Sequence, residues 1–141
     1  TDMRLKVVSL GLLLMMSLCS CGRVATKKSA AVEAAAIANL RMLATLQTTY
    51  RVRKGEYAAD FATLDFCGFQ GDEGQKAGYR YKLYIERKNG KVVGWWCWAY
   101  PTSGGGTRYF FISDDEFVRV SDKAPQRPQD KAAGRALPPV K

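Results

Sequence analysis

Residues 33–50 read EAAAIANLRMLATLQTTY and form the centre of a segment, from about Lys28 to Lys54, that contains neither glycine nor proline. Alanine and leucine are strong helix formers, so this segment predicts one long helix. Its larger apolar side chains recur at steps of three and four residues, which places them on a single broad stripe. We expect Gly55 to end the helix in a left-handed conformation. The stripe consists of Ile37, Leu40, Leu43, Leu46 and Tyr50. A lone helix with one apolar stripe has to be covered by a second layer.

The second layer is predicted to be a sheet. Residues 79–87 (YRYKLYIER) alternate between apolar and polar side chains, which is the period of a strand. Asn89-Gly90 is a strong hairpin turn signal, and residues 92–100 provide the return strand. Two further strands are expected at 108–113 and 117–120, and residues 66–78 are expected to form a loop. The predicted fold class is therefore α+β, with a long N-terminal helix packed on a four-stranded antiparallel β-meander.

The N-terminal segment has the pattern of an export signal. Arg4 and Lys6 precede an apolar run over residues 7–18, and Leu18-Cys19-Ser20-Cys21 closes it. This run is shorter than the roughly 20 apolar residues needed to span a bilayer, so it indicates a secretory signal. The ending resembles the lipobox of bacterial lipoproteins. That resemblance implies cleavage before Cys21, covalent diacylglycerol on the Cys21 thiol and an N-acyl lipid on its amino group. A plain signal peptide cut nearby is the alternative.

These boundaries divide the chain into four parts. Residues 1–20 are the expected lipoprotein signal peptide, 21–27 a tether, 28–121 the folded domain and 122–141 a tail. The tail is rich in proline and carries scattered charges, so we expect it to be flexible.

Charge and composition restrict the function. The chain has 22 Lys and Arg residues against 13 Asp and Glu, a formal charge of +9, which favours anionic neighbours. Histidine is absent, so the commonest general base and metal ligand is missing. The acidic turn at Asp114, Asp115 and Glu116 could bind calcium, but a solvated turn is the favoured interpretation. We expect a protein that is not an enzyme, with no small-molecule substrate, no metal and no cofactor beyond the lipid on Cys21.

The chain has four cysteines. If Cys19 leaves with the signal and Cys21 is lipidated, Cys67 and Cys97 remain. In an oxidising compartment two such thiols most often form a disulfide, so a Cys67–Cys97 bridge is predicted. A zinc site is the competing idea, but these cysteines include no C-x-x-C pair.

Trp95, Trp96, Trp98 and Tyr100 form the best candidate surface, and the hairpin register decides which of them face outward. A two-residue loop at Asn89-Gly90 would pair Leu83 with Trp96 and bury Trp96, Trp98 and Tyr100. A three-residue loop, 88–90, would pair Leu83 with Trp95 and bury Trp95, Cys97 and Ala99. The second register would leave a basic aromatic face suited to sugar rings or bases, although large aromatic residues on a sheet are more often core or partner interface than ligand site. This face would comprise Arg80, Lys82, Trp96, Trp98 and Tyr100.

The order of motifs resembles the globular part of type IV pilins and secretion pseudopilins. Residues 33–50 resemble the exposed half of a pilin helix. Gly78-Tyr79-Arg80-Tyr81 and Trp98-Ala99-Tyr100-Pro101 resemble its first two strands, and residues 108–114 followed by Val118-Arg119 resemble the closing strands. The resemblance implies a pilin-like fold, and it favours the three-residue hairpin loop, because a small residue at Ala99 would let the helix approach the sheet. The chain departs from that family at its start, because the lipobox occupies the place of the Gly-Phe processing site and the apolar half-helix.

From these features we expect a lipid-anchored protein of the bacterial cell envelope, in the outer membrane or periplasm if the cell has two membranes. Its expected role is structural, through protein partners at a secretion or pilus-like apparatus and a membrane contact through the lipid. One alternative is a binding protein for an anionic polymer such as glycan, cell wall or DNA, using the basic aromatic face. The other is a minor pilin or pseudopilin filament subunit.

Overall fold

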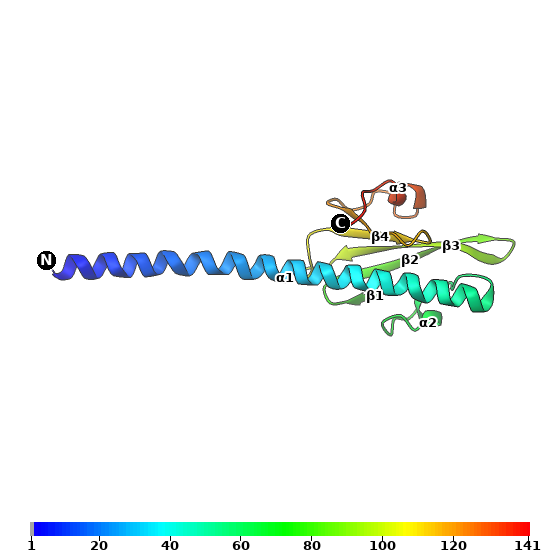
Figure 1. Ribbon diagram of the computed structural model, residues 1–141, viewed down its shortest axis with the longest axis horizontal. Helices are drawn as coiled ribbons and strands as arrows, with labels where there is room; N and C mark the ends of the chain where they lie inside the picture. The colour runs from blue at the N-terminus through cyan, green and yellow to red at the C-terminus, as the bar shows by residue number, and fades with distance from the viewer. Residues whose placement is uncertain (1) are drawn as a thin grey trace.

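The computed structural model describes the backbone from Asp2 to Lys141 and the side chains from Lys28 onward. The fold is α+β, with one long N-terminal helix, α1 (Asp2–Lys54), and one five-stranded antiparallel sheet (Figure 1). The strands pair in chain order, so each connection joins neighbours. The predicted signal peptide, the lipidated Cys21 and the tether lie outside the residues whose side chains are described, and they stay predictions. The remaining elements are α2 (Phe61–Leu64), β1 (Glu73–Lys76), β2 (Tyr79–Lys88), β3 (Lys91–Pro101), β4 (Tyr109–Ser113), β5 (Arg119–Ser121) and α3 (Lys131–Arg135).

The C-terminal half of α1 covers one face of the sheet (Figure 1). The predicted apolar stripe is present: Leu40 and Leu43 are fully buried, and the other members pack around them. Gly55, at φ +77°, ends the helix as expected. By length and composition, Lys28–Lys54 is apolar enough to cross a membrane. The chain therefore has an N-terminal apolar helix compatible with membrane association, although the apolar stripe of this segment packs on the sheet.

The sheet has five strands, one more than predicted. The additional strand, β1, lies within the predicted loop and pairs from Glu73↔Lys82 to Lys76↔Tyr79. Its sequence, EGQK, contains no aromatic or β-branched residue, so nothing in it indicates a strand. A side chain at Gly74 would overlap the ring of Phe69, and this close approach explains the glycine.

The β2–β3 register matches neither predicted alternative. Asn89 and Gly90 do form a two-residue turn, at φ +53° and +77°, with Lys88 paired to Lys91. The ladder then shifts by one residue between Arg87↔Val92 and Glu86↔Gly94, which leaves Val93 unpaired in a β-bulge.

Compared with an uninterrupted ladder from the same two-residue turn, this bulge exchanges the side chains on the two faces of β3. Beyond it Leu83 pairs with Cys97, and Tyr81 with Ala99. The face assignment that we favoured is therefore confirmed, although its pairing is wrong. Trp95, Cys97 and Ala99 belong to the core under α1, while Trp96 and Trp98 lie on the opposite face.

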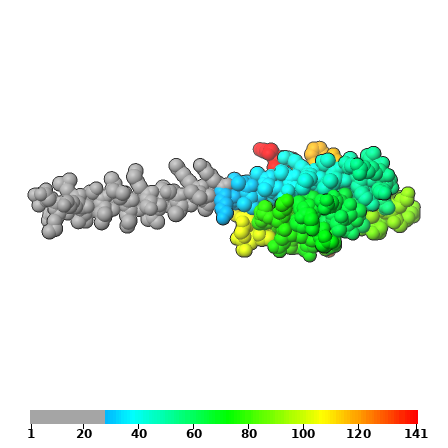
Figure 2. All heavy atoms as spheres, turned by 90° about the horizontal axis from the view of Figure 1, so that it is seen from below, coloured from blue at the N-terminus to red at the C-terminus, as the bar shows by residue number. Residues whose placement is uncertain are grey.

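Residues 122–141, hereafter the tail, differ from the predicted flexible segment. They fold back over the sheet face opposite α1, so the domain has three layers (Figure 1). The backbone N–H of Val120 donates to the Pro138 carbonyl (3.0 Å), and that of Val140 donates to the Val118 carbonyl (2.9 Å), which pairs the tail with β5. Figure 2, seen from below, shows the described part of α1 packed continuously against the segments that follow it.

Candidate functional site

Six aromatic residues occupy the sheet face opposite α1, and we call them the outer aromatic cluster. Tyr84 and Trp96 stack with ring centroids 5.5 Å apart and planes within 8°. Trp98 meets Phe111 edge-on, with centroids 5.0 Å apart. Such pairs contribute about 0.5–1.5 kcal/mol beyond the area they bury. The cluster consists of Tyr84, Trp96, Trp98, Tyr100, Tyr109 and Phe111, contributed by β2, β3 and β4.

The tail covers the two tryptophans that were predicted to be open to ligand. Trp96 is 8% exposed and Trp98 is 3% exposed. Both indole N–H groups donate to the same acceptor, the carbonyl of Pro128, at 2.9 Å and 3.1 Å. An indole has one donor, so this single carbonyl satisfies both rings.

The two predicted cations of this face are paired with carboxylates. Arg80 forms an ion pair with Glu73, and its guanidinium lies 4.2 Å from the centroid of the Tyr100 ring. Lys82 Nζ lies 2.7 Å from Asp72, and the hydrogen bond to this carboxylate raises the pKa of Lys82. The predicted open basic aromatic face is therefore not what the structure presents. It brings all five predicted residues to one face, but it covers the indoles and neutralises the cations.

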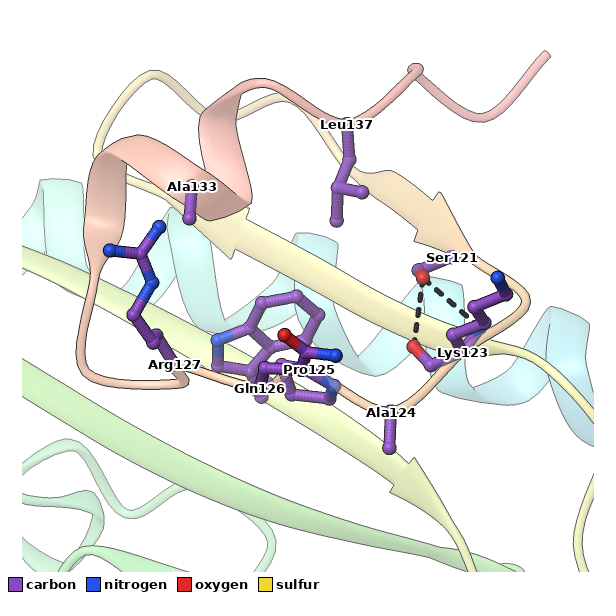
Figure 3. A pocket seen from close by; sticks show the side chains of 9 residues that line it. Ser121, Lys123, Ala124, Pro125, Gln126, Arg127, Ala133 and Leu137 are labelled. Carbon is purple, nitrogen blue, oxygen red and sulfur yellow. Dashed lines mark hydrogen bonds between the residues drawn. The ribbon is translucent and has the colours of Figure 1, made fainter.

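A pocket of about 310 Å³ remains between the tail and the sheet (Figure 3). Trp98 lines the pocket from β3, and Pro125 and Gln126 line it from the loop that precedes α3. Ala133 of α3 and Leu137, which follows α3, line it from the other side. The lining is completed by Ser121, Lys123, Ala124 and Arg127. In Figure 3 the Arg127 guanidinium extends toward α3. The loop that precedes α3 therefore leaves space above Trp98.

The end of the tail is held by charge. Lys131 Nζ lies 2.6 Å from Asp114 Oδ2 and 3.4 Å from Glu86 Oε2. Arg135 also contacts Asp114, and its Nε donates to Ser113 Oγ at 3.1 Å. Gly94 makes room for these groups, because a Cβ there would lie 2.8 Å from Lys131 Nζ. These ion pairs anchor α3 to the turn after β4.

In the acidic turn that could have bound calcium, each of the three carboxylates contacts side chains of this chain. Asp114 binds the α3 cations, Asp115 lies 2.8 Å from Arg119, and Glu116 accepts from Thr48 Oγ1 at 2.6 Å. Burial alone would raise the pKa of Asp115, but hydrogen bonds from Arg119, the Phe117 N–H and Ser113 lower it. Within residues 28–141, no group of three His, Cys, Asp or Glu side chains is placed to hold a metal ion.

Cys67 and Cys97 are free thiols in the structure, which differs from the predicted disulfide. Cys97 faces the core from the middle of β3, where burial raises its thiol pKa. Cys67 lies in the α2–β1 connection at φ +53°, and Lys76 Nζ lies 3.9 Å from its Sγ. Burial also raises the pKa of Cys67, so neither thiol is activated as a nucleophile.

Sequence reasoning missed one buried carboxylate, Glu33 of α1, which is 7% exposed. Its Oε1 accepts from the backbone N–H groups of Thr107 (3.0 Å) and Arg108 (3.2 Å), and its Oε2 accepts from Arg108 Nε (3.0 Å). Burial alone would raise the pKa of Glu33, but these hydrogen bonds and the Arg108 charge lower it. A side chain at Gly106 would overlap Glu33. The glycine-rich loop 104–106 was therefore the sequence feature that could have indicated a close contact at this place. Glu33 ties α1 to the β3–β4 loop.

Comparison with protein-family models, with curated proteins and with solved structures finds no match to this chain.

Proposed function

We propose that this chain is a lipid-anchored protein of the bacterial cell envelope, without enzymatic activity, whose pilin-like domain acts through protein contacts at a secretion or pilus-like apparatus. The observation that carries the proposal is which part of α1 packs on the sheet. The described α1 residues that pack on the sheet lie between Val32 and Tyr50. In the sequence, the apolar run 7–18 and the lipobox-like ending at Cys21 precede this packed segment. An anchor at Cys21 would therefore hold the domain through its long helix, with the sheet and tail facing partners.

A second candidate, a filament subunit, has one observation in its favour. α1 runs without interruption from Asp2 to Lys54, through the residues that a lipoprotein would use as its tether. A continuous helix of this kind is what a pilin-type filament core requires. The two candidates make different use of residues 1–20, because a lipoprotein loses them and a filament subunit packs them.

Metabolic labelling with a fatty acid tests the anchor. We expect label on the wild-type chain and on the Cys19→Ser control, and none on Cys21→Ala. Label that persists in Cys21→Ala, or is absent from the wild type, would contradict the lipoprotein assignment.

In-cell photo-crosslinking tests the interaction role. Met42 is 42% exposed on the outer side of α1, so a photoreactive residue there can reach a partner. The proposal expects a discrete adduct with a different envelope protein. A ladder at multiples of the chain mass would instead favour the filament subunit, and the absence of any protein adduct would count against both.

A further inference from the structure

The tail crosses the outer aromatic cluster with the segment Pro125-Gln126-Arg127-Pro128, in which two prolines stand three residues apart. Proline fixes φ and has no N–H, so such a segment presents its carbonyl oxygens with little conformational freedom left to lose. Here the Pro128 carbonyl accepts both indole N–H groups, from Trp96 and Trp98. The segment then turns at Pro128, where the Asp130 N–H donates to the Arg127 carbonyl at 3.0 Å. Aromatic-lined surfaces are the usual docking sites of proline-rich peptides.

The tail packs on the sheet in two different ways. Its end is close-packed, because Gly134 of α3 lies so near the Phe111 ring that an added side chain would overlap it. The preceding loop, residues 122–130, which we call the lid, leaves the pocket of about 310 Å³ above Trp98. This pocket opens to solvent, so the lid does not close completely over the sheet. The α3 ion pairs can hold the end of the tail while the lid alone is displaced.

We propose that the outer aromatic cluster is a docking site for a proline-rich segment, of the form Pro-x-x-Pro, on a partner protein, and that the lid occupies this site in cis. The partner's carbonyl replaces that of Pro128 on the Trp96 and Trp98 indoles, and its apolar ring surface fills the space above Trp98. The lid's own sequence fits the site and thereby specifies the chemistry of the competitor. This inference rests on the proposed function, because it names the partner class of the same interaction module. Its test does not depend on the anchor, so the two can fail separately.

The test is a peptide titration of the full chain in detergent, followed by the three tryptophan indole N–H signals in NMR spectra. The probe is the hexapeptide APQRPQ, which copies residues 124–129, and its control is AAQRAQ. In the wild type the lid competes at an effective concentration of about millimolar, so we expect binding only at high peptide concentration. In Pro125→Ala/Pro128→Ala the lid has more freedom to lose on closing, about twofold to fivefold per proline, so we expect about tenfold tighter binding. Gln126→Ala/Gln129→Ala changes two lid residues, keeps both prolines and should behave as the wild type.

The expected result is that APQRPQ shifts the Trp96 and Trp98 signals. The Trp95 signal should stay fixed, because that ring lies in the core under α1 and reports an intact fold. Unchanged Trp96 and Trp98 signals at several millimolar peptide, with Trp95 intact, would overturn the proposal. Equal shifts with AAQRAQ would also overturn it, because the site would then bind apolar peptide without regard to proline. Doubling of the sedimentation mass in the double-proline variant, without peptide binding, would assign the site to the lid of a second copy and contradict a separate partner.

Discussion

Replacing Glu33 with alanine should destabilise the domain more than any exposed ion pair can. The substitution removes the acceptor for the backbone N–H groups of Thr107 and Arg108 and for Arg108 Nε, and it leaves the β3–β4 loop without its tie to α1. Leaving a buried donor without a partner costs about 1–3 kcal/mol. The Arg108 side chain is 42% exposed and can be hydrated again, and Thr107 is itself exposed, so we count each of the two backbone donors near the lower end of this range. We expect a loss of about 2–3 kcal/mol, which corresponds to a decrease in Tm of about 10 °C for a domain of this size.

The assay is urea unfolding followed by tryptophan fluorescence, with Glu73→Ala as the matched control. Glu73 also loses an arginine partner, Arg80, but its side chain is 49% exposed, so its removal should cost less than about 1 kcal/mol.

Acidification gives a second readout with a defined sign. The folded-state pKa of Glu33 is lowered from 4.5, so its carboxylate stabilises the fold above that pH, and this stabilisation is lost as the pH falls through the folded pKa. The difference in the free energy of unfolding between wild type and Glu33→Ala should therefore shrink as the pH falls below about 5. A Glu33→Ala loss no larger than that of Glu73→Ala, or a difference that widens on acidification, would refute this account of the Glu33 contact.

Three further predictions concern the tail and the thiols. Gly134→Ala should force α3 away from Phe111 and lower the free energy of unfolding by about 1–3 kcal/mol, whereas Gly104→Ala, with open space around it, should be near neutral in the same urea titration; equal effects would show that α3 is not close-packed. Lys131→Ala/Arg135→Ala should release α3 from Asp114 and increase acrylamide quenching of the tryptophan fluorescence, and an unchanged quenching constant would argue against the ionic anchor. Alkylation of the native protein, read by peptide mass, should label Cys67 before the fully buried Cys97 and label both in urea; a Cys67–Cys97 linked peptide in a non-reduced digest would instead restore the predicted disulfide.

The elements with strong local signals were predictable from the sequence. The apolar stripe of α1, the Gly55 stop and the Asn89-Gly90 turn each depend on neighbouring residues, and each is present. The register was not predictable, because the bulge at Val93 lies outside the Asn89-Gly90 turn that was used to set the pairing. One unpaired residue was enough to exchange the faces of β3.

The tail was misjudged for a related reason. Its prolines and charges are typical of a flexible segment, but their partners lie far away in the sequence: Pro128 meets Trp96 and Trp98, and Lys131 meets Asp114. Composition alone carries no information on such long-range contacts. The Asp130 N-cap before α3, whose side chain accepts from the Ala133 N–H, was the one local signal for order in this segment.

Intact-mass measurement of the protein isolated from its native membrane tests the central proposal most directly. The account predicts a chain that begins at Cys21 and carries the added mass of diacylglycerol and an acyl group. A product that retains residues 1–20, or an unmodified Cys21, would contradict it.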